Sequence, residues 1–278
     1  MDLRPAAGNA PAIGAFNVIQ LEHAEAIVAA AELTGTPVIL QLSENTVTYH
    51  GTLAPMGRAL LEIAAHGKVP IGVHLDHATD PDLVAAAVEL GFDSVMYDAS
   101  ALPHEENVKR TKDVVRFCHG RQVWVEAELG EIGGKDGVHA PGVRTDPGEA
   151  ARYVEETGVD ALAVAVGSSH AMLTRDARLD FDLITALHAV TPVPLVLHGS
   201  SGVPDDQLAR AVQAGMWKIN IATQLNKVFT KAVRTRLGDD TVLVDPRRYL
   251  GAGRESVIAE VARLIGILNG RPVVKGSP

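Results

Sequence analysis

Three histidines in this 278-residue chain each stand at the C-terminal end of an apolar, strand-like run. His77 closes a His-Leu-Asp-His motif, His170 follows Ala161–Val166 after Gly-Ser-Ser, and His198 directly follows Pro194–Leu197. One histidine near a strand end is more often a structural residue, but three imidazoles that converge at one rim suit a divalent metal. Zinc held by three protein nitrogens keeps a fourth position open for chemistry. The pattern therefore predicts a catalytic metal centre.

Carboxylates accompany these histidines. Asp76 directly precedes His77 and could move a proton on a substrate hydroxyl, although it could instead only orient a metal-bound histidine. Glu126 and Glu128 alternate along one strand candidate and so share a face. Charge inside a barrel is costly unless it meets a metal or a basic group. The pair therefore indicates a metal site, with a structural salt bridge as the alternative.

Small residues follow the last two strand candidates. They are Gly199, Ser200, Ser201, Asn220, Ile221, Ala222 and Thr223. Their backbone N–H groups could face a phosphate, and the loops after strands seven and eight are the usual phosphate site of a barrel. A polar run from Gly133 to Gly142 is long enough to form a lid.

The elements that must position these residues alternate regularly between strand and helix. The strand candidates are Ile13–Val18, Pro37–Leu42, Pro70–Leu75, Ser94–Tyr97, Gln122–Glu128, Ala161–Val166, Pro194–Leu197 and Trp217–Ile221. Most are short and apolar without alternation, which is typical of parallel strands buried on both faces. Helical patterns lie between them, and those around Leu21–Leu33 and Pro81–Leu90 stop before a glycine. The alternation favours a (β/α)₈ TIM barrel over an open sheet.

A barrel carries its active site at the C-terminal ends of its strands. The unusual polar residues fall at these ends, namely Asn17, Ser43, Asp76, His77, Asp98, Glu128, His170, His198 and Asn220. No Pro-, Gly- or Ser-rich linker divides the chain, so a single domain over residues 1–278 is expected. After the barrel, Asp245–Tyr249 precedes an extra C-terminal helix predicted at Gly253–Leu268. Such a helix commonly covers a barrel end or makes a subunit contact, and we expect a homodimer or homotetramer.

Composition excludes several classes of partner. A formal net charge of −9 argues against nucleic acid and anionic membranes as partners. No 18-residue apolar stretch is free of charge, and the N-terminus lacks the pattern of a signal peptide. The only cysteine, Cys118, fits a reducing compartment and is expected to be buried packing at a helix end. We therefore expect a cytoplasmic protein.

Taken together, these motifs resemble the class II, metal-dependent ketose-bisphosphate aldolases. The resemblance covers nearly the whole chain, from Ala15 to Arg247, and any one motif alone would be weak. The most specific segments are His74-Leu75-Asp76-His77, Tyr97-Asp98-Ala99-Ser100, Glu126-Ala127-Glu128-Leu129-Gly130, Gly167-Ser168-Ser169-His170, His198-Gly199-Ser200-Ser201-Gly202 and Asn220-Ile221-Ala222-Thr223.

The resemblance implies a role for each matching residue. It implies zinc, or another divalent metal, on His77, His170 and His198, with Asp76 as the acid/base at the C4 hydroxyl of a ketose bisphosphate. Asp98 and Glu128 match a second or alternative metal position, and a monovalent cation, Na⁺ or K⁺, is also compatible. The remaining matches are substrate contacts. They are Asn17 at the rim, the two phosphate segments Gly199–Ser201 and Asn220–Thr223, and Ser43 and Arg254 at the far phosphate.

The chain departs from the family pattern at two places. Ala171 follows His170 where the family usually has a glycine with its backbone on the phosphate. The lid segment carries Lys135 and Asp136 where the family has a glutamate that abstracts a proton from dihydroxyacetone phosphate. Asp136 is therefore a hypothesis for that base. An imine mechanism is not indicated, because Lys218 begins the eighth strand at the opposite rim.

Several functions remain open from the sequence. The leading prediction is a metal-dependent aldolase that cleaves a ketose bisphosphate, first of all fructose 1,6-bisphosphate, to dihydroxyacetone phosphate and an aldehyde phosphate. Tagatose 1,6-bisphosphate and the keto-sugar phosphate of inositol breakdown are alternative substrates. A barrel metallohydrolase is a second class, although the His-x-His pair or carboxylated lysine it normally uses is not seen. A catalytically silent sugar-phosphate binder is a third.

Overall fold

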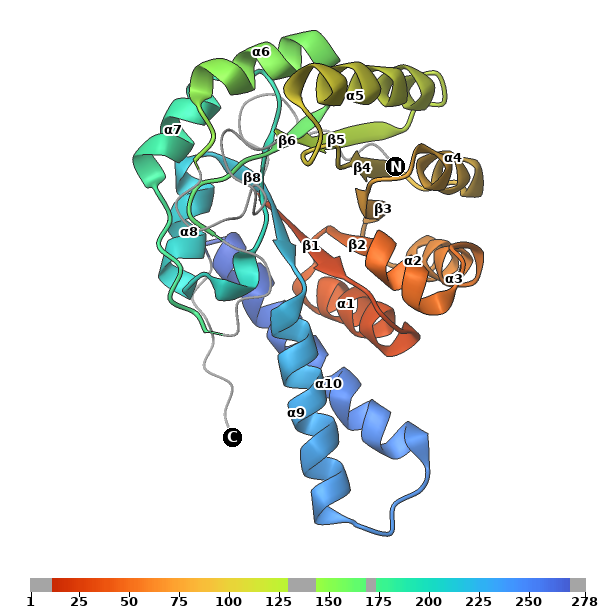
Figure 1. Ribbon diagram of the computed structural model, residues 1–278. Coiled ribbons are helices and arrows are strands. Elements are labelled where there is room, and N and C mark those ends of the chain that lie inside the picture. Colours follow the sequence, from red (N-terminus) through yellow and green to blue (C-terminus); the bar gives the residue numbers. More distant parts are fainter. Residues whose placement is uncertain (1–11, 130–143, 169–173, 271–278) are drawn as a thin grey trace.

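The computed structural model describes residues 12–129, 144–168 and 174–270. Eight parallel strands close into a barrel, in which β1 pairs with both β2 and β8 (Figure 1). The strands are β1 (Ile13–Asn17), β2 (Val38–Ser43), β3 (Ile71–Ala78), β4 (Ser94–Tyr97), β5 (Trp124–Glu128), β6 (Ala161–Ala163), β7 (Leu195–Leu197) and β8 (Met216–Ile221). The predicted TIM barrel is confirmed.

Helices surround the strands, and two of them extend beyond the barrel. The helices are α1 (Leu21–Thr34), α2 (Glu44–His50), α3 (Ala54–Ala65), α4 (Pro81–Leu90), α5 (His104–His119), α6 (Pro147–Thr157), α7 (Phe181–Val190), α8 (Asp205–Ala214), α9 (Thr223–Asp239) and α10 (Pro246–Leu268). The helices α9 and α10 pack against each other as a hairpin that projects from the barrel wall (Figure 1). None of the helices in the described ranges has the length and hydropathy that a bilayer crossing requires.

Capping residues set the bounds of several helices. Asp80 and Asp146 each accept a backbone hydrogen bond at a helix start that has proline in its first turn. Gly35 and Gly91 end α1 and α4 in the left-handed conformation, at φ 62° and 105°. The buried Cys118 lies near the end of α5, as expected. Local residue chemistry therefore accounts for where these helices begin and end.

Three element bounds show the largest differences from the sequence predictions. The C-terminal helix begins at Pro246 rather than at Gly253, because Asp245 caps it and proline fits its first turn. Gly253 lies inside this helix, where an added Cβ would stand 2.6 Å from the Phe229 ring of α9. The strand β3 continues to Ala78, three residues past its predicted end, whereas β6 stops at Ala163.

Apolar packing is concentrated between the strands and the helices. The main apolar cluster joins residues of both layers, whereas two small clusters on the strands contain only three buried residues each. Within the barrel, the residues beside these small clusters are polar. They include His74, Ser94, Glu126 and Lys218, which line one small cavity together with Trp124 and Trp217. The barrel centre therefore holds charged groups where such barrels usually hold branched apolar ones.

A buried histidine on α1 makes stability depend on pH. His23 is 3% exposed and packs on Phe229, and burial lowers its pKa to about 4. The unfolded chain protonates it near pH 6.5, so stability is full above that value and is lost as pH falls toward 4. From pH 7 to pH 5 we expect the free energy of unfolding to fall by roughly 2 kcal/mol through this residue.

Urea unfolding of His23→Gln at both pH values measures this contribution. The variant should lose about 2 kcal/mol less than the parent protein over the same interval. Glutamine in place of His66, which is exposed at the end of α3, is the matched control and should follow the parent. If the parent and His23→Gln lose the same free energy, the buried imidazole is not the source.

Candidate active site

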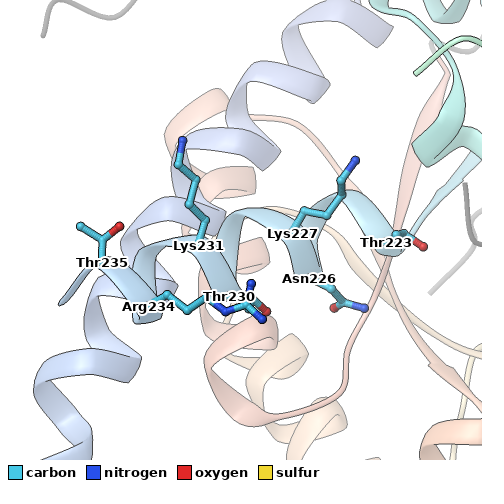
Figure 2. A pocket seen from close by; sticks show the side chains of 7 residues that line it. All are labelled: Thr223, Asn226, Lys227, Thr230, Lys231, Arg234 and Thr235. Carbon is cyan, nitrogen blue, oxygen red and sulfur yellow. The ribbon is translucent and has the colours of Figure 1, made fainter. Parts of the chain in front are cut away.

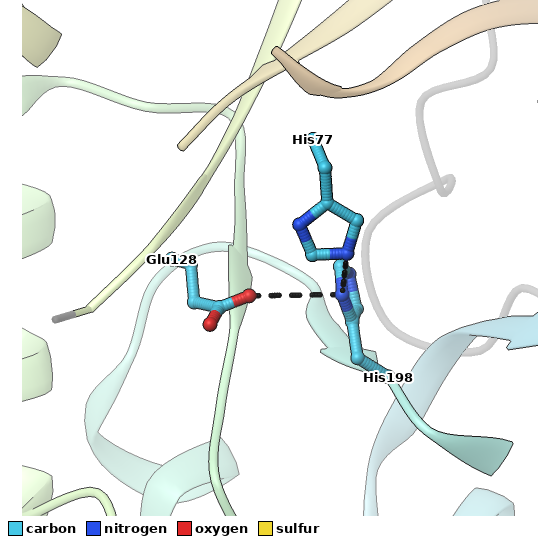
Figure 3. A group of neighbouring side chains, drawn as sticks. All are labelled: His77, Glu128 and His198. Carbon is cyan, nitrogen blue, oxygen red and sulfur yellow. Dashed lines mark hydrogen bonds and ion pairs between the residues drawn. The ribbon is translucent and has the colours of Figure 1, made fainter. Parts of the chain in front are cut away.

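Two histidines and a glutamate converge at the C-terminal rim of the barrel. His77 comes from β3, Glu128 from β5, and His198 follows β7 (Figure 3). One ligand atom of each lies within 4.8 Å of the others. The Nε2 atom of His77 is 3.0 Å from Nδ1 of His198, which is in turn 3.6 Å from Oε2 of Glu128. Two imidazoles and a carboxylate at this spacing are a donor set that fits zinc.

A backbone irregularity brings Asp76 and His77 to the same place. Consecutive residues of a regular strand point to opposite faces. Here the β3–β4 register shifts between Leu75 and Ala78, and His77 adopts φ 50°. A bulge of this kind re-aims side chains, and a positive φ at a non-glycine residue is uncommon. The strand does not simply end before His77; the bulge within it turns the imidazole toward His198.

Asp98 contacts the other nitrogen of His77. Its Oδ2 atom lies 2.9 Å from Nδ1 of His77, and its Oδ1 atom accepts from the hydroxyl of Ser100 at 2.6 Å. Asp98 is therefore absent from the donor cluster formed by the described residues. Burial would raise the pKa of Asp98, but the hydrogen bonds from His77 and Ser100 outweigh it and hold the pKa well below its ordinary value.

The rim is strongly negative. Burial would lower the pKa of His77, yet the carboxylates of Asp76, Asp98 and Glu128 outweigh burial and raise it to about 10. The surroundings of His77 therefore favour a positive charge. A divalent cation would supply the same positive charge at this position. Both the negative charge of the surrounding carboxylates and the types of donor atom therefore suit a metal ion.

Two asparagines hold Asp76. The amide of Asn17 donates to Oδ2 of Asp76 at 2.8 Å, and Asn220 approaches Oδ1 at 3.4 Å. Gln41 in turn donates to Asn17 at 3.0 Å. The Asp76 side chain is 3% exposed. These contacts orient a buried carboxylate at the edge of the metal-binding cluster, as an acid/base group requires.

The predicted phosphate segments lie side by side. Gly199 is left-handed at φ 66° and starts a short 3₁₀ turn. The hydroxyl of Ser201 accepts from the backbone of Ala222 at 3.3 Å and of Gln224 at 3.1 Å. These two loops are therefore tied together at the start of α9. The other residues of these segments are Ser200, whose hydroxyl donates to the Leu197 carbonyl, and Asn220, Ile221 and Thr223, which end β8 and begin α9.

A groove continues outward from Thr223 along α9. Its volume is about 440 Å³, and it is lined by Thr223, Asn226, Lys227, Thr230, Lys231, Arg234 and Thr235 (Figure 2). Its cationic side chains are compatible with an anionic compound near the predicted phosphate segment.

Ser43 and Arg254, the predicted contacts to the far phosphate, have different surroundings. Ser43 stands opposite Asp76 in the β2–β3 register, and its hydroxyl caps α2 by accepting from the Thr46 backbone at 3.3 Å. Arg254 lies on α10 and pairs with Glu25 of α1 at 3.0 Å. Ser43 is thus near the rim. Among the described residues, the ion pair of Arg254 is with Glu25 and not with His77, Glu128 or His198.

Three predicted site residues, His170, Ala171 and Asp136, lie outside the described residues. The sequence reasoning also misplaced Lys218. It is 2% exposed inside the barrel, where its Nζ atom donates to Glu126 at 2.7 Å. The signal was available, because residues two apart on a strand share a face and Asn220 was already assigned to the active-site rim of the same strand. Lys218 therefore belongs to the polar interior and not to the opposite rim.

Comparisons with known proteins agree with this geometry. The family model described as fructose-bisphosphate aldolase class-II matches residues 2–271. The chain belongs to the class II fructose-bisphosphate aldolase family. This aldolase is 44% identical over 255 residues to a fructose-bisphosphate aldolase of Geobacillus stearothermophilus, covering 90% of this chain and 88% of that protein.

Two further relatives are also aldolases. A 6-phospho-5-dehydro-2-deoxy-D-gluconate aldolase of Bacillus licheniformis is 41% identical, with 88% of this chain and 85% of that protein covered. The crystal structure of the YdjI aldolase of Escherichia coli K12 is 31% identical with a TM-score of 0.83, covering 94% and 93% of the two chains. The chain is thus a carbon–carbon lyase of a metal-dependent family that acts on phosphorylated sugars, and the metallohydrolase alternative is not supported.

Proposed function

We propose that this aldolase cleaves fructose 1,6-bisphosphate reversibly to dihydroxyacetone phosphate and an aldehyde phosphate, with zinc as its metal. The observation that carries the proposal is the convergence of His77, Glu128 and His198 beside the buried carboxylate of Asp76. His170 is proposed as the third histidine ligand. Glu128 adjoins a second metal position, and Asp98 orients His77 through Nδ1.

The chemistry follows from the positions of these groups. Asp76 accepts the proton of the C4 hydroxyl as the C3–C4 bond breaks, and the electron pair of that bond stays on C3 of the dihydroxyacetone phosphate half. Asp136 is proposed to supply the proton that C3 then takes up to give dihydroxyacetone phosphate. Asn17 and Asn220 keep the carboxylate directed at that hydroxyl. A bound divalent cation would polarise the ketone and offset the negative charge that develops. The segments around Ser201 and Ala222 are proposed to hold the adjacent phosphate through backbone N–H groups.

The relative named for 6-phospho-5-dehydro-2-deoxy-D-gluconate supports that compound as a second candidate substrate.

We expect EDTA to abolish triose phosphate release from fructose 1,6-bisphosphate, and zinc to restore it. In a panel with tagatose 1,6-bisphosphate and the deoxygluconate phosphate, kcat/KM should be at least about tenfold higher for fructose 1,6-bisphosphate, or about 1.4 kcal/mol in transition-state binding. Turnover that resists EDTA, or a preference for another substrate, contradicts the proposal.

We further propose that the enzyme acts in the cytoplasm as a single domain within a homodimer or homotetramer. Val242 and Val244, between α9 and α10, are 84% and 87% exposed. Apolar side chains at the tip of a projecting hairpin support contact with a second copy of the chain.

A further inference from the structure

A chain of buried polar groups runs through the barrel centre to His198. The Nζ atom of Lys218 on β8 donates to Oε2 of Glu126 on β5 at 2.7 Å. The other carboxylate oxygen of Glu126 lies 2.9 Å from Nε2 of His198. On its far side, Lys218 lies 3.3 Å from His74, which contacts Ser94 at 2.8 Å. All five side chains belong to residues no more than 6% exposed.

The hydrogen bonds specify which nitrogen of His198 carries the ring proton. A carboxylate oxygen is an acceptor, and Oε1 of Glu126 lies 2.9 Å from Nε2 of His198, so Nε2 is the nitrogen placed to carry the ring proton. The other nitrogen, Nδ1, lies 3.0 Å from Nε2 of His77 and 3.6 Å from Oε2 of Glu128. The Asn220 amide also lies 3.0 Å from Nε2, but a charged carboxylate is the stronger acceptor. Nδ1 is therefore the atom that points into the metal-binding cluster.

Lys218 orients Glu126 toward His198. Its ammonium group holds Oε2 of Glu126 at 2.7 Å, which leaves Oε1 directed at Nε2 of His198. The carboxylate is thereby fixed as the acceptor of the Nε2 proton. The nearby His74 cannot replace the cation, because burial and the charge of Lys218 hold its pKa well below the ordinary value. Lys218 is the one cation that contacts Glu126 among the described residues.

We propose that Lys218 and Glu126 form a positioning pair that fixes the tautomer and orientation of His198, so that Nδ1 faces the metal. This inference rests on the proposed function, because it concerns the metal that His198 is assigned to bind. Carboxylates behind metal-bound histidines commonly do this, and their loss typically weakens metal binding about 10–100-fold. A buried ion pair is poor evidence for a purely stabilising role, because apolar residues of similar volume often serve stability as well or better.

Zinc affinity of the full-length apoprotein, measured by competition with a chromophoric chelator, tests the pair. In Glu126→Gln the amide oxygen must face Lys218, so its NH₂ group meets Nε2 and favours the wrong tautomer. In Lys218→Met the carboxylate loses the contact that holds Oε2, so Oε1 is no longer fixed against Nε2 of His198. We expect each single variant to bind zinc about 10–100-fold more weakly than the parent.

The double variant, which combines Glu126→Gln with Lys218→Met, tests whether the two residues act together. With no cation present, the introduced amide can turn its oxygen to Nε2 of His198 and restore the correct tautomer. We expect the zinc dissociation constant of the double variant to return to within about tenfold of the parent value. If the two residues acted independently, the losses of the single variants would add instead. Because the double variant is neutral at both positions, it also remains testable if Lys218→Met alone fails to fold.

The matched control removes a buried hydrogen bond elsewhere. The Tyr153 hydroxyl bonds to Asn107 and Thr111 in the helical layer, so Tyr153→Phe should lower the apoprotein Tm and leave zinc affinity unchanged. Single variants that bind zinc like the parent, or a double variant no tighter than the single ones, overturn the positioning pair. A parent protein that binds no zinc at all overturns the proposed function and this inference together.

Discussion

Replacement of Asp76 by asparagine is expected to lower kcat about 10³-fold, within the range for a positioned general base. The amide keeps the size of the side chain but cannot accept the C4 proton. Asp76 lies outside the donor cluster formed by His77, Glu128 and His198, so zinc content should stay near one equivalent. Triose phosphate release in a coupled assay and metal content on the same sample measure the two quantities.

The control for this variant is an aspartate at the other end of the barrel. Asp160 accepts from the Val125 backbone at 2.8 Å, at the start of β5. Asp160→Asn removes a comparable charge and should change kcat less than threefold, on the scale of a surface change. If Asp76→Asn also retains kcat within threefold, another group takes the C4 proton.

The second large effect is expected at His77. Asparagine is the most informative replacement, because the residue has φ 50° and asparagine tolerates the left-handed region. Loss of a ligand nitrogen should raise the zinc dissociation constant more than 100-fold, beyond the usual effect of outer groups. Activity should fall in parallel and return only partly with excess zinc.

His119→Asn provides the matched control. His119 contacts Asp160 at 2.8 Å near the end of α5, and its replacement removes an imidazole without touching the rim. Zinc affinity and kcat should then equal those of the parent. Full zinc binding by His77→Asn, measured with the folded state verified by circular dichroism, would exclude this residue as a ligand.

Much of the fold could be predicted because parallel barrels have strong local signals. Apolar runs such as Pro194–Leu197 fit strands buried on both faces, and Asp-Pro and glycine signals fit helix ends. The rim could also be predicted, since all parallel strands end on one side. His77 and His198 do approach each other there, whereas the roles of all site residues remain predictions.

Other features depend on contacts between distant segments. The ion pair of Lys218 and Glu126 forms only when β8 and β5 face each other across the closed barrel. The bulge at His77 involves the register with β4, which no local pattern in β3 reveals. Gly253 was predicted to begin the last helix, but it lies inside that helix because the Phe229 ring of α9 packs against it and leaves no room for a Cβ. In each case a tertiary contact overrides local propensity.

The bulge in β3 joins the proposed base and a proposed ligand through a single peptide unit. Asp76 and His77 are consecutive, and the left-handed backbone at His77 fixes the angle between their side chains. A cation of larger ionic radius would push the His77 ring outward, and the connecting peptide would carry that displacement to Asp76. Turnover should therefore discriminate among divalent cations of different radius more sharply than affinity does.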